Sequence, residues 1–433
     1  MAEKTHSLPT LDLSALPGPE TILREELDNG VTVLIRENFA SPSVVVAGYL
    51  TAGALADEPE RWGQAHLTAL ALMRGTEGRS FQEIFEALES VGARLGFQAN
   101  AHSTSFQGKS LAEDLPLLLE LLEEVLSSPT FPSREVERLK SQHLTSLAIR
   151  AQDTGAQAQM AFDELVYPDH PYRVPVDGYV ESVGRLTPAA LRRFHRREYG
   201  PQGMVVAIVG GMERERALEV VTQALSKWAA PGGGPMRRVP PAPELKEIVR
   251  REVNLPGKQQ SDLVIGAAGP SRFAPDFMAA ALGNSILGRF GLMGRIGDVV
   301  RERAGLAYYA YSAVSGGPGP GPWQVLAGVA PEKESAAVEL ILQEIRRFTQ
   351  RKVSSEELRE NQSNFIGRLP LQLESNEGVA SALAYIERYG LGLDYYQRYP
   401  GMIEAITREQ ILETARRHLD PERLAIAIAG PER

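Results

Sequence analysis

Residues 63–76, GQAHLTALALMRGT, place a single histidine in a short apolar stretch with helical periodicity. Two histidines four residues apart on one helix face are a zinc-binding pattern, and a neighbouring glutamate can act as general base on metal-bound water. Here His66 is present, but Leu70 stands one turn later and Ala69 precedes it. A lone histidine on an apolar helix is ordinarily a core or cleft residue, so this stretch by itself does not predict a metal site.

The composition narrows the class of protein. The chain has 433 residues, 43% of them hydrophobic and 23% charged, which is typical of a soluble globular protein. Its formal net charge of -9 argues against a nucleic-acid partner, and it has no cysteine for disulfides or thiolate metal sites. No apolar run reaches the roughly 18 residues that a membrane-spanning helix needs. The N-terminus lacks the apolar core of a signal peptide, which favours the cytoplasm, or the periplasm if a signal was removed.

An internal repeat relates two distant segments. Residues 186–211, LTPAALRRFHRREYGPQGMVVAIVGG, align with 406–431, ITREQILETARRHLDPERLAIAIAGP. Each reads as a helix capped by threonine, a turn containing proline, and a buried strand that ends at glycine. A second pair, 131–140 and 353–362, opens a helix with serine ahead of glutamate in both copies. The chain is therefore predicted to consist of two homologous halves.

The repeat and the composition suggest domain boundaries. Residues 228–247 are rich in glycine and proline without apolar periodicity, so we interpret them as a linker. The predicted organisation is an N-terminal extension (1–24), an N-terminal half (25–227), this linker, and a C-terminal half (248–433). Strands at the start, helices in the middle and a final strand in each half predict an α+β fold with a sheet covered by helices.

The motifs resemble the insulinase/pitrilysin family of zinc peptidases, in the branch of the processing peptidases. GQAHLTALALMRGT aligns without a gap to the family's metal helix, and VRERAGLAYYAYS (300–312) and YPDHPYRVPVDG (167–178) match further segments. The resemblance runs from about residue 25 to the C-terminus. It implies two similar α/β sandwich-like domains in each half, which together form a bowl, or half of a chamber.

The resemblance also implies what the metal site lacks. His66 matches the first histidine of the family motif, whereas Ala69 replaces the catalytic glutamate and Leu70 the second histidine. The distal glutamate ligand falls at Ser146. Because a catalytic zinc needs three protein ligands and an open position, no metal is expected in this chain and His66 is interpreted as vestigial. A rebuilt site through His66 and His143 is an alternative, although it still lacks a general base.

A second site is better preserved. Family members carry an arginine and a tyrosine seven residues apart, and this chain has Arg301 and Tyr308. By resemblance they hold the substrate backbone and help the oxyanion of the tetrahedral intermediate. From the residues alone, RERAG followed by LAYYAYSAV is simply a helix, a glycine stop and a strand, with Arg301 on the surface and Tyr308 at the start of a buried strand.

Three neighbouring segments complete the expectations. Residues 92–108 resemble the family's edge strand, which pairs with extended peptides, and His102 within them is expected to face solvent. Residues 285–300 resemble a glycine-containing helix, and 315–323 are expected to form an exposed hairpin connection.

The function that these observations favour is a non-catalytic subunit of a heterodimeric zinc metallopeptidase. Arg301 and Tyr308 would act in the active site of a homologous zinc-bearing partner, on peptide substrates. Zinc is expected in the partner and no cofactor in this chain, which could form a homodimer when alone. The alternatives are an inactive structural or peptide-binding protein of the same fold, and an enzyme with a metal held by His66 and His143. The sequence does not identify the substrate.

Overall fold

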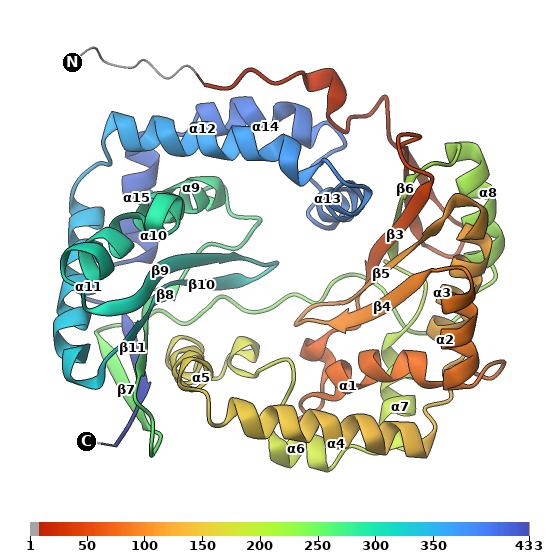
Figure 1. Ribbon diagram of the computed structural model, residues 1–433, viewed down its shortest axis with the longest axis horizontal. Helices are drawn as coiled ribbons and strands as arrows, with labels where there is room; N and C mark the ends of the chain where they lie inside the picture. The colour runs from red at the N-terminus through yellow and green to blue at the C-terminus, as the bar shows by residue number, and fades with distance from the viewer. Residues whose placement is uncertain (1–7, 433) are drawn as a thin grey trace.

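The computed structural model describes residues 8–432; residues 1–7, at the start of the predicted N-terminal extension, and residue 433 lie outside the described part. Two sheets lie on opposite sides of the molecule, each with its own layer of helices (Figure 1). Across the described chain, we find no helix with the length and apolarity needed to cross a membrane.

The first sheet has six strands in the order β1-β2-β6-β3-β5-β4. β2 and β6 run parallel, and all other neighbours are antiparallel. β4 is therefore an edge strand, as expected for residues 92–108. The strands are β1 (Leu23–Glu26), β2 (Thr32–Glu37), β3 (Ser43–Leu50), β4 (Arg94–Ala99), β5 (Thr104–Leu111) and β6 (Val205–Gly210).

The second sheet repeats this topology. Its order is β7-β11-β8-β10-β9, with β7 and β11 parallel and the other pairs antiparallel. β7, β11, β8, β10 and β9 thus correspond to β2, β6, β3, β5 and β4, which confirms the two homologous halves. The strands are β7 (Val249–Asn254), β8 (Ser261–Ala268), β9 (Ala307–Gly316), β10 (Pro320–Val329) and β11 (Ala425–Gly430).

The helices follow the same repeat. The hydroxyl of Thr187 accepts a hydrogen bond from the Ala190 amide at the start of α7, and Thr407 does the same with Gln410 at the start of α15, as the sequence predicts. In the first half the helices are α1 (Gln64–Ala71), α2 (Phe81–Ser90), α3 (Leu115–Ser127), α4 (Ser133–Arg150), α5 (Thr154–Val166), α6 (Val180–Gly184), α7 (Pro188–Glu198) and α8 (Arg214–Leu225). In the second they are α9 (Phe277–Gly288), α10 (Phe290–Ile296), α11 (Glu334–Gln350), α12 (Ser355–Gln372), α13 (Asn376–Arg388), α14 (Tyr395–Glu404) and α15 (Arg408–His418).

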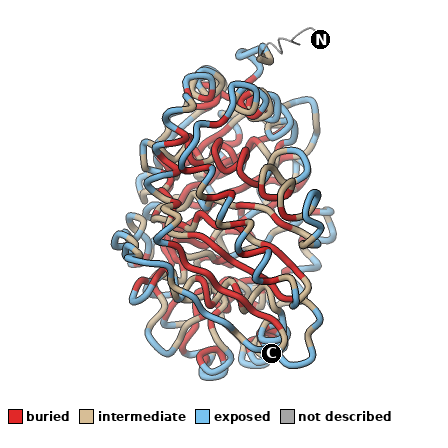
Figure 2. The backbone as a smooth tube through the Cα atoms, turned by 90° about the vertical axis from the view of Figure 1, so that its left-hand side faces the viewer, coloured by how far each residue is buried: buried red, intermediate tan, exposed pale blue. Residues whose placement is uncertain are grey.

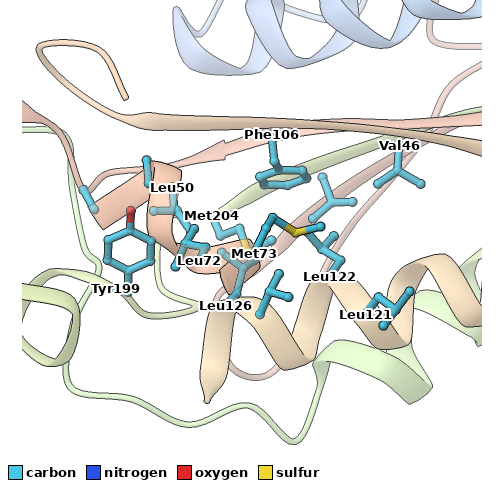
Figure 3. Packing of buried hydrophobic residues seen from close by; sticks show 14 of the residues in the cluster. Val46, Leu50, Leu72, Met73, Phe106, Leu121, Leu122, Leu126, Tyr199 and Met204 are labelled. Atoms are coloured by element: carbon cyan, nitrogen blue, oxygen red, sulfur yellow. The ribbon is translucent and has the colours of Figure 1, made fainter. Parts of the chain in front are cut away.

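Each half has a core between its sheet and the helices outside it. In the first half, leucines of α3 pack against Val46, Leu50 and Phe106 from the sheet (Figure 3). The fully buried Trp323 of β10 lies in the corresponding core of the second half. Viewed from the side of the second half, buried strands lie beneath helical segments that alternate between buried and exposed residues (Figure 2). This alternation is the amphipathic pattern from which the helices were predicted.

The two halves exchange one helix each. α13, from the second half, covers the inner face of the first sheet, where Leu383 packs with Val45 and Val205. α5, from the first half, covers the inner face of the second sheet, where Phe162 packs with Ala427. Since α5 and α13 occupy equivalent places in the repeat, the exchange is reciprocal.

The mixed α/β class and the two-half organisation are confirmed. The described residues form one sheet in each half, where the resemblance implied two similar domains per half. The physical reason is that helices supply the second layer of each half, so each half is a single sheet-and-helix unit. Residues 228–247 contain no helix or strand, only an isolated bridge from Gly233 to Gln202.

Candidate functional site

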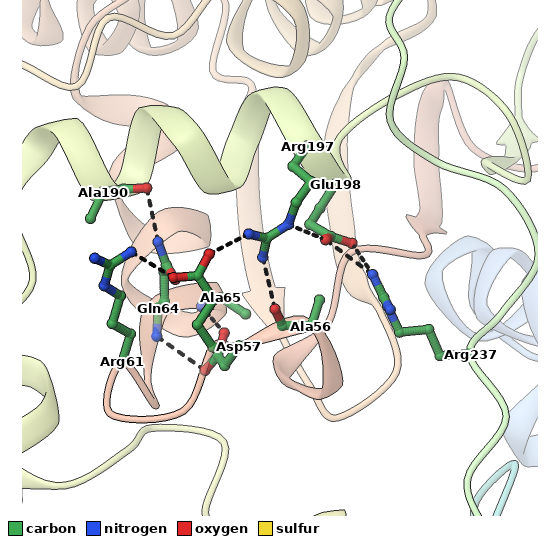
Figure 4. A network of polar contacts seen from close by, with 10 residues as sticks. Ala56, Asp57, Arg61, Gln64, Ala65, Ala190, Arg197, Glu198 and Arg237 are labelled. Carbon is green, nitrogen blue, oxygen red and sulfur yellow. Dashed lines mark hydrogen bonds and ion pairs between the residues drawn. The ribbon is translucent and has the colours of Figure 1, made fainter.

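The helix that carries His66 is anchored at its N-terminus. The buried carboxylate of Asp57 accepts hydrogen bonds from the backbone amides of Gly63, Gln64 and Ala65 at 2.8, 3.1 and 2.8 Å (Figure 4). Burial raises the pKa of Asp57 to about 7, although the three amides favour the ionised form. The Gln64 side-chain amide also donates to the Ala190 carbonyl of α7 at 2.8 Å. These contacts fix α1 in place without any metal.

The positions that would complete a metal site on α1 are apolar and packed. Ala69 is only 1% exposed and belongs to the core of the first half. Leu70 is half-buried and packs against the same core. On α4, Ser146 is exposed, and its hydroxyl donates to the Gln142 carbonyl of its own helix at 3.3 Å. None of the three therefore offers a metal ligand or a catalytic base.

The structure does bring His66 and His143 together. Their ring centroids lie 4.7 Å apart, with an interplanar angle of 35°. The Nε2 of buried His143 lies 2.8 Å from the backbone carbonyl of Asp177, so Nε2 carries the proton in this contact. Burial lowers the pKa of His66, with a smaller contribution from the charge of His143 and an opposing one from Asp177.

This pair does not fit a catalytic zinc. Within residues 8–432, no three histidine, aspartate or glutamate side chains are grouped so that they could hold a metal ion. The carboxylate of Asp177, whose charge acts on His66, forms an ion pair with Arg150. A zinc ion would thus find two imidazoles, one of them bound to a carbonyl, and no general base.

Arg301 and Tyr308 lie on either side of a glycine turn. Arg301 belongs to a π-helical segment, Gly297–Arg303, and Gly305, two residues after it, adopts the left-handed region (φ +59°). The amide of Gly305 donates to the Arg301 carbonyl at 3.1 Å, and β9 begins two residues later. The predicted helix, glycine stop and strand are therefore confirmed, with a π-helix in place of an ordinary one.

Both side chains are accessible. Tyr308 is 84% exposed, on the edge strand of the second sheet, although it was the candidate first residue of a buried strand. Arg301 is partly exposed, and its one ion pair in the described chain is a 3.6 Å contact with its neighbour Glu302. A guanidinium and a phenol held in this way can donate hydrogen bonds to a molecule outside the chain.

The glycine-containing helix expected before Arg301 is broken. Within α10, residues 291–294 have non-helical dihedral angles, and Gly291 and Gly294 have φ of +61° and +62°. Met293 also has positive φ, which is rare for a residue with a side chain. The break leaves Leu292 exposed immediately before the segment that carries Arg301.

The expectation that His102 faces solvent is wrong. His102 is only 5% exposed, and its Nε2 lies 2.6 Å from the hydroxyl of Tyr172. The same hydroxyl accepts a hydrogen bond from the Gly319 amide at 2.9 Å, in the turn between β9 and β10. Burial lowers the pKa of His102 to about 4. Tyr172, 70 residues further along the chain, contacts His102 and is itself bound by Gly319 of the second half, and local sequence indicates neither contact.

The sequence analysis also missed a cleft of about 780 Å³ between the first sheet and α13. Arg94 of β4, Lys109 of β5 and Arg388 of α13 line it. Arg94 and Lys109 face each other in the antiparallel register, so strand alternation could have placed these two on one face. Arg388 comes from the exchanged helix, and no local pattern would have placed it there.

The chain matches known proteins over nearly its whole length. A family model described as Insulinase (Peptidase family M16) matches residues 32–166, and one described as Peptidase M16 inactive domain matches 185–365. An uncharacterized zinc protease of Mycobacterium tuberculosis is 28% identical over 418 residues, 94% of this chain and 93% of the relative. The mitochondrial-processing peptidase subunit beta of Saccharomyces cerevisiae is 24% identical over 287 residues, 64% of this chain and 60% of the relative.

A solved structure agrees with these matches. The crystal structure of a peptidase M16 inactive domain from Pseudomonas fluorescens superposes with a TM-score of 0.88 at 27% identity, and covers 95% of this chain and 98% of that chain. The two family models describe consecutive parts of one family and between them span both halves of the chain. The chain therefore belongs to the insulinase, or M16, family of peptidases.

Proposed function

We propose that this chain is the non-catalytic subunit of a two-chain M16 zinc metallopeptidase that acts on peptides. Its partner would be a homologous chain with an intact histidine–glutamate–histidine motif, which supplies the zinc. Arg301 and Tyr308 would reach into that partner's active site. The observation that carries the proposal is the contrast between an 84% exposed Tyr308 and the packed apolar side chains of Ala69 and Leu70.

The chemistry of the two side chains suits this role. The guanidinium of Arg301 presents several N–H donors in a fixed plane, which suits the carbonyl oxygens of an extended peptide. The hydroxyl of Tyr308 can donate one directional hydrogen bond to an oxyanion that develops when a peptide bond is attacked. Neither role needs a metal in this chain. Further support is that a relative, the yeast processing peptidase chain, is named as a subunit.

The first test is assembly with a partner. The purified chain is mixed with a homologous M16 chain that has the complete metal motif, and the mixture is analysed by size exclusion and by cleavage of a quenched fluorescent peptide. We expect a complex whose turnover exceeds that of either chain alone. No complex, with the partner active by itself, would contradict the proposal. Metal analysis of this chain alone should show no stoichiometric zinc; a full equivalent would instead favour a site at His66 and His143.

The second test asks whether Arg301 and Tyr308 act in the partner's active site, or whether the two chains only assemble. In the reconstituted pair, Tyr308→Phe removes one oxyanion donor and should lower kcat by about 100-fold, and Arg301→Ala should lower kcat/KM comparably. Tyr311→Phe, three residues further along β9 and half-buried, and Arg303→Ala, exposed on the same helical segment, are matched controls and should leave turnover unchanged. If the two chains assemble but the Arg301 and Tyr308 variants both retain full turnover, these two side chains do not act in the partner's active site.

The alternative is an inactive structural or peptide-binding protein of the same fold. The family model that matches 185–365 is described as an inactive domain, which favours neither function over the other. Reconstitution distinguishes the two functions. The alternative predicts a complex, or a homodimer of this chain, that has no peptidase turnover, so the Arg301 and Tyr308 variants would have no turnover to lower.

A further inference from the structure

A cavity of about 390 Å³ lies where four helices of the second half meet. Side chains from α9, α12, α13 and α14 line it, and α12 and α14 lie above α9 and α13 in Figure 1. Gln372 and Ser381 in its lining are exposed, so the cavity opens to solvent there. Its size and apolar walls suit a small organic ligand. Most of the walls are aromatic or aliphatic side chains, among them Phe277, Phe365, Leu369, Leu373, Tyr396 and Tyr399.

A buried arginine without a counter-ion lies behind one wall of this cavity. Arg272, in the loop between β8 and α9, is only 6% exposed, and within residues 8–432 it forms no ion pair. Its backbone amide donates to the Gly317 carbonyl at 2.9 Å, which holds the loop in place. Its guanidinium carbon lies 5.0 Å from the centre of the Phe277 ring and 5.7 Å from that of Tyr395, and both rings line the cavity. Aromatic rings attract a cation but carry no net charge, so the buried positive charge is not neutralised.

Two tyrosine hydroxyls connect this charge to the cavity. Nη2 of Arg272 donates to the Tyr395 hydroxyl at 3.0 Å, and Nε donates to the Tyr385 hydroxyl. Both tyrosines line the cavity, and within the described chain neither hydroxyl donates its own proton to another group. Burial raises the pKa of Tyr395 to about 12, so its hydroxyl stays protonated at neutral pH. The pair therefore offers O–H donors, polarised by a cation, to an acceptor in the cavity.

We propose that this cavity binds a small monocarboxylate with an unbranched hydrocarbon tail, of the class of medium-chain fatty acids. Its carboxylate accepts hydrogen bonds from the hydroxyls of Tyr385 and Tyr395 and supplies the counter-ion that Arg272 lacks. Its tail is buried against the apolar side chains of α9 and α12. Apart from the tyrosine hydroxyls and the exposed Gln372 and Ser381, the lining has no hydrogen-bonding side chain for the amide groups of a peptide, which favours a hydrocarbon tail.

This inference goes beyond the proposed subunit role and does not rest on it. Neither Arg301 nor Tyr308 lines the cavity, so a failure to bind carboxylates would leave that role intact, and the absence of a catalytic partner would leave the cavity intact. The cavity lies between two hydrophobic clusters, because Tyr395 packs with the inner cover of the first sheet whereas Met278 and Phe365 pack against the core of the second half. A bound ligand therefore contacts both clusters and should raise the unfolding temperature of the chain.

The test is isothermal titration calorimetry at neutral pH with the purified full chain and three probes: octanoate, octanamide and acetate. Octanoate has the tail and the charge, octanamide has the same tail without the charge, and acetate has the charge without the tail. Octanoate should bind about tenfold more tightly than octanamide, because hydrogen bonds to a charged acceptor are stronger than those to a neutral one. Acetate should bind far more weakly than octanoate, because it has no tail to bury.

Variants assign the binding to this cavity. Tyr395→Phe keeps the ring and removes one donor, so it should weaken octanoate binding about tenfold. Arg272→Met removes the buried charge and should lower the affinity for octanoate to that for octanamide. Tyr399→Phe is the matched control, because this tyrosine lines the same cavity without a hydrogen bond to Arg272, and it should leave octanoate binding unchanged. Tyr395→Phe tests the site even if Arg272→Met folds poorly.

Three results would overturn the proposal. Equal affinity of the wild-type chain for octanoate and octanamide would show that the charge is not recognised. Unchanged octanoate affinity in the Tyr395→Phe variant, or the same loss in Tyr399→Phe, would show that the hydroxyl bound to Arg272 does not hold the carboxylate. Binding of acetate as tight as that of octanoate would show an anion site in which the apolar walls play no part.

Discussion

At the scale of single residues, the positions on α1 that would complete a metal motif with His66 are packing surface. Ala69 lies in the core at 1% exposure, so a glutamate at this position would bury a carboxylate against leucines and alanines. Within residues 8–432, the ring of His66 lies beside that of His143, and the pair belongs to no group of three side chains that could hold a metal ion.

Another histidine makes stability depend on pH. His195 of α7 is buried, and its Nε2 donates to the Leu126 carbonyl at 2.8 Å. Burial lowers its pKa to about 4, against an unfolded value near 6.5. The unfolded state therefore binds more protons between pH 6.5 and 4, and stability is lost as the pH falls through this window.

We expect this one group to cost about 2 kcal/mol of unfolding free energy between pH 7 and pH 5. Urea unfolding of the wild type and of His195→Gln at both pH values measures the effect. The variant keeps an N–H donor but does not titrate, so its stability should fall by about 2 kcal/mol less over the same interval. Identical losses in both proteins would show that His195 does not carry this dependence.

At the scale of elements, the exchanged helices hold the two halves together. α13 buries its apolar side on the first sheet, with Leu383 fully buried among Val45, Val205 and Val209. The same helix supplies Arg388 and Glu377 to the cleft. Its packing therefore sets both the stability of the first half and the position of Arg388 in the lining of the cleft.

Leu383→Ala should lower the free energy of unfolding by about 2–5 kcal/mol, because it leaves a cavity at a fully buried position. The matched control is Leu371→Ala on α12, where the leucine is 69% exposed and the change should stay within about 0.5 kcal/mol. Both are measured by urea unfolding. A loss below about 1 kcal/mol for Leu383→Ala would mean that α13 contributes little to the first sheet.

At the scale of the whole molecule, each half lacks a helix of its own to cover the inner face of its sheet. The first sheet takes its inner cover from residues 376–388, and the second sheet takes its cover from residues 154–166. Separation of the halves would therefore expose an apolar sheet face and an apolar helix in each fragment.

We expect fragments 1–247 and 248–433 to be poorly folded when expressed singly and to form a stable complex when expressed together. The cut lies at the end of the linker, which contains no helix or strand, so it breaks no element. Circular dichroism and thermal unfolding of each fragment and of the pair make the comparison. Two fragments that each unfold cooperatively near the temperature of the intact chain would show that the exchange is dispensable.

Local patterns predicted much of the fold. The threonine caps at Thr187 and Thr407, the linker and the paired final strands depend on interactions within a few residues, which the sequence displays directly. One part of the candidate site could be predicted for the same reason. Gly305, a residue in the left-handed region, separates the helical segment that carries Arg301 from the strand that follows it. The types of Ala69 and Leu70 also show, without any coordinates, that the two-histidine motif is incomplete at His66.

The sequence by itself therefore determined the family, the repeat and the absence of a complete metal motif, since residue types and short spacings carry these features. Only the tertiary structure decided that Tyr308 is exposed, that His102 is buried against Tyr172, and that Arg388 joins Arg94 in one cleft. The place of Arg388 depends on the packing of α13 on the first sheet, and the burial of His102 depends on its contact with Tyr172. Such contacts join residues far apart in the chain. They form because whole apolar faces are buried together, and no local sequence pattern shows which faces will meet.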